Sequence, residues 1–97
     1  MTESDKFKIK FSIFQTLTNK STAEVASMIG YSRAHIYKVL SGDRVASVGL
    51  IDSLNSLVLF AFGSTMLELV NETINLIENT ETGRLLIEGY SNAGSSN

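Results

Sequence analysis

The feature that most constrains this chain is a pair of short apolar-faced segments joined by one glycine. Ser21 and Glu24 have the spacing of a capping box, in which each side chain accepts a hydrogen bond from the backbone N–H of the other, so a helix begins there. Gly30 predicts the end of this helix, because glycine adopts the left-handed conformation that closes a helix at little cost. Ser32 then caps a second helix that extends to about Leu40.

A turn this short predicts that the two helices cross tightly. Ala26 is small enough to let a neighbouring helix approach closely. Val25 and Ile29 on the first helix, and Ile36 and Val39 on the second, face the angle between them. Because these side chains are used in packing, the opposite face of the second helix is expected to stay exposed.

That exposed face carries hydrogen-bond donors and no acidic residue. An α-helix fits the major groove of DNA, where arginine binds guanine O6 and N7 and where hydroxyl and imidazole groups bind other base edges. Residues near the N-terminus of such a helix reach the bases first, so we assign base contacts to Ser32, Arg33 and His35. For His35, a solvated helix position is an equal alternative. Tyr37, one turn further on, contacts a base edge or a phosphate; the alternative, which we favour less, is that it only covers the helix surface.

A second group of residues suits the DNA backbone. Lys38, Ser41 and Arg44 lie at or beyond the end of the second helix, and we assign them to phosphate contacts, which position a protein without reading sequence. Thr22, at the start of the first helix, completes the candidate DNA-binding residues.

Charge is divided unevenly along the chain. Residues 1–45 hold seven Lys and Arg against four Asp and Glu, whereas residues 46–97 hold one against six, which together give the net charge of −2. A basic front half suits contact with a polyanion, and an acidic back half suggests a different task. Lys6, Lys8 and Lys10 are either an arm that reaches phosphates or a solvated helix face, and we favour the solvated face.

Apolar periodicity predicts helix over most of the remaining chain. An N-terminal helix has one apolar stripe, formed by Phe7, Phe11, Phe14 and Leu17. Another helix is expected over residues 47–62 and should end at Gly63. The predicted fold class is therefore all-α with about five helices, and residues 1–62 form the DNA-binding region.

The C-terminal third is expected to assemble the protein. Thr65 and Glu68 match a capping box that would open a fifth helix ending near Asn79. Residues 81–90 are interpreted as a short helix in preference to a strand, and residues 91–97 as a disordered tail. The fifth helix has a wide apolar set: Met66, Leu67, Leu69, Val70, Ile74 and Ile77. Because two apolar faces need two partners, we expect residues 63–90 to form a homodimer or higher homo-oligomer, with packing inside one chain as the alternative.

Residues 22–40 resemble the helix-turn-helix of phage and bacterial regulators. The family's alanine, turn glycine and branched residues correspond to Ala26, Gly30, Ile36 and Val39. The run 32–37 is also similar to the DNA-binding segments of resolvases and excisionases, and residues 41–62 are more loosely similar to five-helix repressors of the Cro and CI type. The resemblance implies a sequence-specific transcription regulator, commonly a dimer.

The functional hypothesis is a transcription regulator, most simply a repressor with activation as the alternative, that binds a palindromic operator in double-stranded DNA as a homodimer. The recognition helices of a two-fold dimer would enter successive major grooves, about 34 Å apart. Two alternatives remain open. One is a protein-interaction module, such as an antitoxin or anti-activator, that retains a helix-turn-helix. The other is a recombination accessory factor of the excisionase kind, which bends DNA.

The sequence holds few signs of other chemistry. There is no cysteine, one histidine, and no paired-carboxylate, phosphate-loop or metal-ligand spacing, so we expect no enzyme, no cofactor and no metal site. The longest apolar run, residues 57–62, is too short to span a bilayer, and residues 1–10 lack the apolar region of a signal peptide. We expect no membrane partner and a cytoplasmic location, in a bacterial cell or a phage-infected host.

Overall fold

The computed structural model describes residues 1–80, which contain five helices and no strand. The helices are α1 (Glu3–Thr18), α2 (Thr22–Ile29), α3 (Arg33–Leu40), α4 (Val48–Phe62) and α5 (Ser64–Asn79). The predicted all-α class with about five helices is confirmed. The predicted short helix over residues 81–90 and the predicted tail over residues 91–97 lie outside the described residues.

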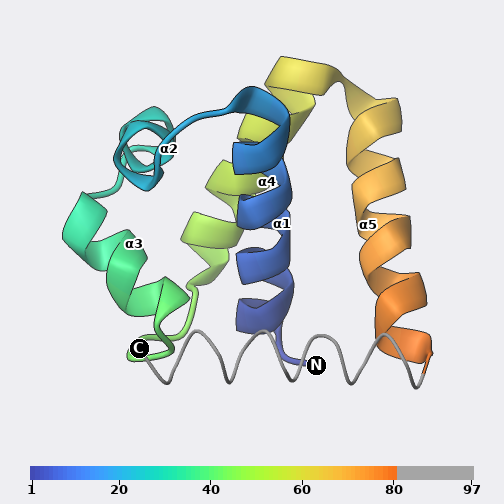
Figure 1. Cartoon of the computed structure of the whole chain (residues 1–97), viewed down its shortest axis with the longest axis horizontal. Coiled ribbons are helices and arrows are strands. Elements are labelled where there is room, and N and C mark those ends of the chain that lie inside the picture. Colours follow the sequence, from blue (N-terminus) through green and yellow to red (C-terminus); the bar gives the residue numbers. More distant parts are fainter. Residues whose placement is uncertain (81–97) are drawn as a thin grey trace.

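The helices are arranged around a central pair. Helices α1 and α4 lie in the middle of the molecule, with α2 and α3 on one side and α5 on the other (Figure 1). Helix α4 contacts α1, α2 and α5, and α1 also contacts α3 and α5. The short helices α2 and α3 are thus held by two longer ones.

Local signals set most of the helix ends. The Ser21 hydroxyl accepts a hydrogen bond from the Glu24 N–H at 3.1 Å, and the Glu24 carboxylate accepts one from the Ser21 N–H at 3.0 Å. The hydrogen bond from the Ser21 N–H stabilises the ionised Glu24 carboxylate and so lowers the pKa of Glu24. Gly30 follows at φ 80°, in the left-handed region. Thr2 and Asp5 form a further capping box at the start of α1, which the sequence analysis did not identify.

One capping-box prediction is wrong. Helix α5 begins at Ser64 with Gly63 as its N-cap residue and without a side-chain cap hydrogen bond, so Thr65 already lies inside the helix. Gly63 has φ 87° and ψ 171°, a region that essentially only glycine occupies. This conformation takes the chain from α4 into α5 within one residue, which leaves no free position for a side-chain cap.

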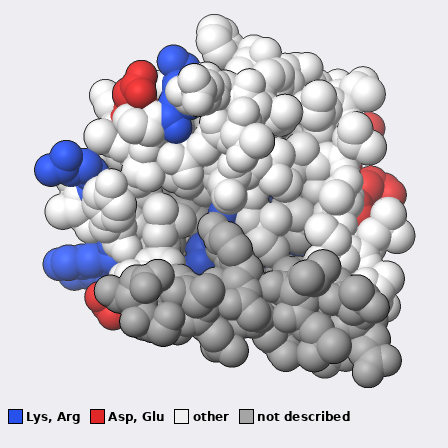
Figure 2. Space-filling view, viewed as in Figure 1, with Lys and Arg blue, Asp and Glu red and all other residues white. Residues whose placement is uncertain are grey.

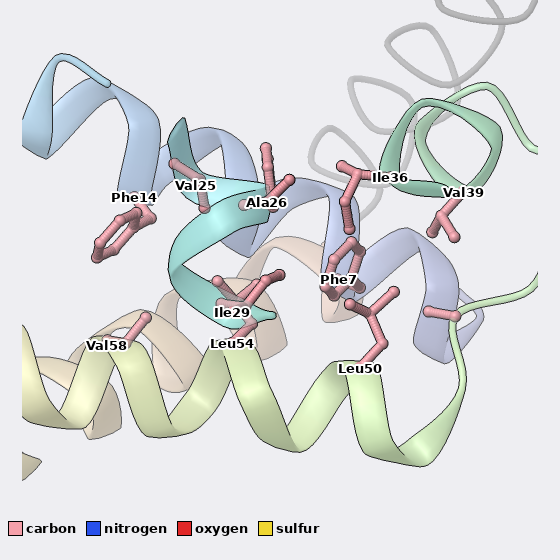
Figure 3. Close-up of a cluster of buried hydrophobic side chains, with 12 residues drawn as sticks. Phe7, Phe14, Val25, Ala26, Ile29, Ile36, Val39, Leu50, Leu54 and Val58 are labelled. Atoms are coloured by element: carbon pink, nitrogen blue, oxygen red, sulfur yellow. The ribbon is translucent and has the colours of Figure 1, made fainter. Parts of the chain in front are cut away.

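The core lies where α2 and α3 meet α1 and α4. The predicted inward residues of α2 and α3 are all buried, and they face a stripe on α4 (Figure 3). That stripe is formed by Leu50, Leu54 and Val58. Phe7, Phe11 and Phe14 close the cluster from α1.

One expectation about α1, that its three N-terminal lysines share a solvated face, is wrong. Leu17, the last residue of the predicted apolar stripe, is 52% exposed, because it lies in the last turn of α1 at the edge of the core. Lys10 is only 8% exposed, because it lies on the same apolar stripe as Phe7 and Phe14, and its ammonium group donates a hydrogen bond to Asn55 Oδ1 at 2.6 Å. The three N-terminal lysines therefore do not share one solvated face.

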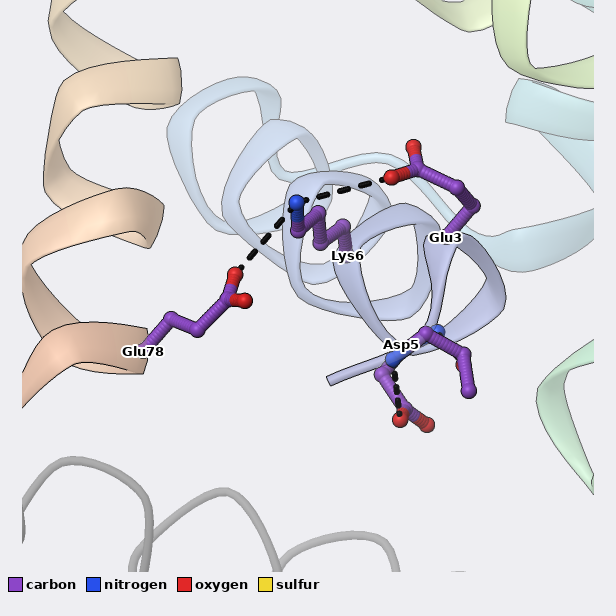
Figure 4. A network of polar contacts seen from close by, with 5 residues as sticks. Glu3, Asp5, Lys6 and Glu78 are labelled. Atoms are coloured by element: carbon purple, nitrogen blue, oxygen red, sulfur yellow. Dashed lines mark hydrogen bonds and ion pairs between the residues drawn. The ribbon is translucent and has the colours of Figure 1, made fainter.

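Lys6 joins α1 to α5. Its ammonium group lies 3.3 Å from a Glu78 carboxylate oxygen and 3.4 Å from a Glu3 carboxylate oxygen (Figure 4). The hydrogen bond with Glu78, followed by the negative charge of Glu3, raises the pKa of Lys6. Both carboxylates compensate the charge of this lysine.

Candidate nucleic-acid interface

The exposed face of α3 lies opposite its buried residues Ile36 and Val39. Arg33, Tyr37 and Lys38 are exposed, as predicted from the helical spacing. Ala34 is also exposed and precedes Lys38 by one turn, so it lies near the middle of this face. Ala34 is not among the predicted DNA-binding residues, although its position four residues before Lys38 places it on this face.

The N-terminal end of α3 has two distinct sides. The Ser32 hydroxyl oxygen accepts a hydrogen bond from the His35 N–H at 3.1 Å, so Ser32 caps the helix and its hydroxyl proton stays available. Residues two apart on a helix point in nearly opposite directions, which separates Arg33 from His35. The half-buried His35 ring stacks on Tyr31, with centroids 5.5 Å apart and an angle of 25° between the planes. Arg33 is therefore the freer of the two base-contact candidates.

The C-terminal end of α3 brings together the residues assigned to phosphate contacts. The Lys38 carbonyl oxygen accepts hydrogen bonds from the Arg44 N–H and from the Ser41 hydroxyl, both at 3.1 Å. Gly42, at φ 88°, allows the turn between them. These bonds hold Lys38, Ser41 and Arg44 in one compact turn.

Lys8 of α1 is a further basic residue beside this turn. A Cβ atom added to Gly42 would lie 3.9 Å from the Lys8 ammonium nitrogen. Charge patterning predicts a solvated helix face for Lys8, because nothing local in the sequence indicates that α1 passes the end of α3. The structure thus adds a third cation beside the turn that connects Lys38 to Arg44.

Thr22 is the first residue of α2, and its hydrogen-bonded contacts are with α1 and the link between the two helices. Its hydroxyl oxygen accepts a hydrogen bond from the Gln15 side-chain amide at 3.1 Å, and the same amide donates to the Lys20 carbonyl oxygen at 3.3 Å. Thr22 is half-buried, so its observed contacts join α2 to α1.

Charge is distributed unevenly over the molecule. In the view of Figure 2, the side that carries α2 and α3 shows Lys and Arg side chains with acidic groups among them, while the side that carries α5 shows Asp and Glu. Helix α3 itself has no acidic residue; Asp43 lies in the turn that follows it. The α3 face thus combines two basic side chains, a tyrosine and a small apolar residue on a rigid helix.

Other kinds of site find little support in residues 1–80. No group of three or more His, Cys, Asp or Glu side chains is placed to hold a metal ion there. Within the same range, every helix is too short or too polar to cross a membrane.

Comparison with known proteins gives no further assignment. No protein-family model, no curated protein and no solved structure matches this chain.

Proposed function

We propose that the chain binds double-stranded DNA in a sequence-specific way through the exposed face of α3, and that it regulates transcription, most simply as a repressor. Arg33 and Ala34 enter the major groove first, where arginine binds guanine and a methyl group contacts thymine. Lys38, Ser41, Arg44 and Lys8 bind phosphates on one flank. This function requires access to DNA, in the cytoplasm of a bacterial cell or a phage-infected host.

One observation carries the proposal. Helix α3 is anchored by two fully buried side chains, Ile36 and Val39, while its opposite face is exposed and free of acidic groups. A helix held in this way can be inserted into a groove without rearrangement of the core. The cations at its C-terminal end supply the non-specific attraction that most DNA-binding proteins use.

The proposal includes a homodimer formed through α5. Val70 and Ile74 are buried against the rest of the chain, but Leu69 and Leu76 on another side of α5 are 57% and 65% exposed. Leu69 and Leu76 are seven residues apart and therefore share one face of the helix. A second copy of the chain would cover these exposed leucines and remove them from water.

The position of α5 affects the spacing of the DNA half-sites. Because α3 and α5 lie on opposite sides of the central pair, a two-fold axis beside α5 leaves both α3 helices at the outer ends of the dimer. Five helix-to-helix steps of 8–10 Å then separate them, about 40–50 Å in total. We therefore propose half-sites spaced by more than the single turn of about 34 Å first expected.

Substitutions on the α3 face test the proposal. Arg33→Ala should weaken binding to the preferred sequence by about 1–3 kcal/mol and leave binding to random duplex nearly unchanged. Lys38→Ala and Lys8→Ala should each lower the salt slope of binding by about one unit on both DNAs. Fluorescence anisotropy from 50 to 200 mM salt measures these effects.

Two matched variants act as controls. Lys6→Gln removes a lysine that Glu3 and Glu78 already compensate, so the salt slope should stay the same. Asp43→Asn removes the acidic group beside the phosphate contacts, so DNA affinity should increase. Equal losses for Lys6→Gln and Lys38→Ala would contradict the assigned interface.

A protein-binding module is the second candidate, and one apolar surface favours it. Phe60 is 91% exposed and lies beside Met28 and Leu57 at a shallow groove between α2 and α4. A pure protein-binding module would show no salt-sensitive binding to random duplex at low salt, which distinguishes it from a DNA-binding regulator.

A further inference from the structure

A hollow of about 260 Å³ lies between α1, α4 and α5, away from the α3 face. Its apolar lining comes from Phe7, Leu54 and Ile74, which are all buried, and from the half-buried Ile51. Its polar lining includes Lys10, Asn71 and Asn75. Its volume lies just below the usual range of ligand pockets, about 300–1,000 Å³, and its lining is more polar than that of most such pockets.

Lys10 is the unusual member of this lining. It is 8% exposed, and its ammonium group, which has three N–H donors, makes one hydrogen bond to Asn55. Within residues 1–80 it forms no ion pair with a carboxylate. Loss of solvation lowers the pKa of Lys10, and the negative charge of Glu3 opposes this shift without cancelling it. A buried charge normally has an opposite charge beside it, so Lys10 has room for an anionic partner.

The other charged groups at the hollow are already compensated. Glu3 and Lys6 line its rim and lie within 3.4 Å of each other, and Glu78 completes the pairing of Lys6 (Figure 4). The side-chain amides of Asn71 and Asn75 make no hydrogen bond inside the described part of the chain. A buried ammonium group that forms no ion pair within residues 1–80 and free amide donors therefore meet at the same hollow.

We propose that this hollow binds a small organic acid, whose carboxylate is held by the Lys10 ammonium group and the asparagine amides and whose short apolar chain packs on Phe7, Leu54 and Ile74. The volume equals that of about eight or nine water molecules, which corresponds to a ligand of similar heavy-atom number. Such a ligand contacts α1, α4 and α5 at once. The proposal does not depend on DNA binding, and its test uses no DNA.

The test is a titration of the full ¹⁵N-labelled chain with sodium isovalerate, followed by NMR. Isovalerate should cause saturable shifts of the side-chain amide signals of Asn55, Asn71 and Asn75. Isovaleramide has the same size without the charge and should bind at least tenfold more weakly, and sodium chloride should cause no saturable shift. Absence of saturable shifts with isovalerate up to 50 mM, or equal affinity for isovaleramide, would overturn the proposal.

Variants locate the site. Lys10→Met retains the volume of the side chain without the charge and should lose isovalerate binding at least tenfold. Lys8→Met, which removes a lysine of the same helix outside the hollow, should bind isovalerate as the wild type does. Asn75→Ala changes an exposed rim position, leaves the core intact and should weaken binding several-fold. Unchanged affinity in Lys10→Met and in Asn75→Ala would show that this hollow is not the site.

Discussion

The two glycines that terminate helices α2 and α4 should respond differently to the same substitutions. Gly30 lies at φ 80° and ψ 25°, in the left-handed helical region, whereas Gly63 lies at φ 87° and ψ 171°. A Cβ atom added at either position would meet no atom within 4 Å, so neither substitution causes a clash. The change in unfolding free energy that each substitution causes should therefore depend on backbone conformation alone.

The magnitudes follow from the two conformations. For Gly30→Ala, the left-handed conformation destabilises the folded chain by about 1–2 kcal/mol. Alanine also reduces the conformational freedom of the unfolded chain, which stabilises the protein by about 0.4–1 kcal/mol. We expect a net destabilisation of about 1 kcal/mol. Asparagine tolerates the left-handed region, so Gly30→Asn should cost only a few tenths of a kcal/mol. Gly63→Ala and Gly63→Asn should both cost about 1–3 kcal/mol, because that region is essentially restricted to glycine.

Urea denaturation of the full chain, followed by far-ultraviolet circular dichroism at one protein concentration, measures these differences. The slope of free energy with urea should stay constant across the four variants, since the surface exposed on unfolding does not change. A Gly30→Ala variant as stable as the wild type would refute the left-handed turn between α2 and α3. If Gly63→Asn destabilised the protein as little as Gly30→Asn does, the assigned conformation of the α4–α5 link would be refuted.

Three further predictions concern a buried charge, a helix cap and an interface. Lys10→Met should be between neutral and about 2 kcal/mol more stable than the wild type at neutral pH, because it removes a desolvated cation. The pKa of Lys10 is lower in the folded chain than its ordinary value of 10.5, so between these two pKa values the unfolded chain binds more protons than the folded chain. The wild type should therefore gain stability relative to Lys10→Met as the pH rises toward 10.5. If the difference in unfolding free energy between the two proteins stayed constant in urea titrations from about pH 7 to 10.5, this expectation would be contradicted. Ser32→Ala should lower the free energy of unfolding by about 1 kcal/mol, because the helix cap is lost. Ser32→Asp should keep the cap and weaken DNA binding through its negative charge. Equal stability of the two variants would show that Ser32 does not cap α3. The double variant Leu69→Ser, Leu76→Ser should be a folded monomer by light scattering, and a persistent dimer would place the interface elsewhere.

Much of the fold could be predicted because its signals are local. The Ser21 and Glu24 capping box, the glycine at position 30 and the Ser32 cap each act within four residues. Sequence periodicity therefore identified the buried faces of α2 and α3 and, by exclusion, the exposed face of α3. The capping-box pattern predicted Thr65 as the N-cap of α5, but the observed N-cap is Gly63, two residues earlier in the chain, which is not part of that pattern.

The remaining errors arise from contacts between distant segments. Lys10 lies on the stripe between Phe7 and Phe14, so periodicity alone indicates burial, but the hydrogen-bond partner Asn55 is 45 residues away. Lys8 likewise joins the turn at Gly42 only through the packing of α1 beside α3. Charge patterning alone treated these lysines as one solvated group, and the tertiary fold separates them into three environments.

Selection of bound duplexes from a random DNA library, with the wild-type chain and with Arg33→Ala in parallel, tests the central claim most directly. The wild type should enrich a palindromic consensus that contains a guanine in each half-site, with half-site centres more than one helical turn apart. Arg33→Ala should enrich the same palindrome with relaxed preference at that guanine. Failure of the wild type to enrich any sequence would contradict DNA recognition by α3.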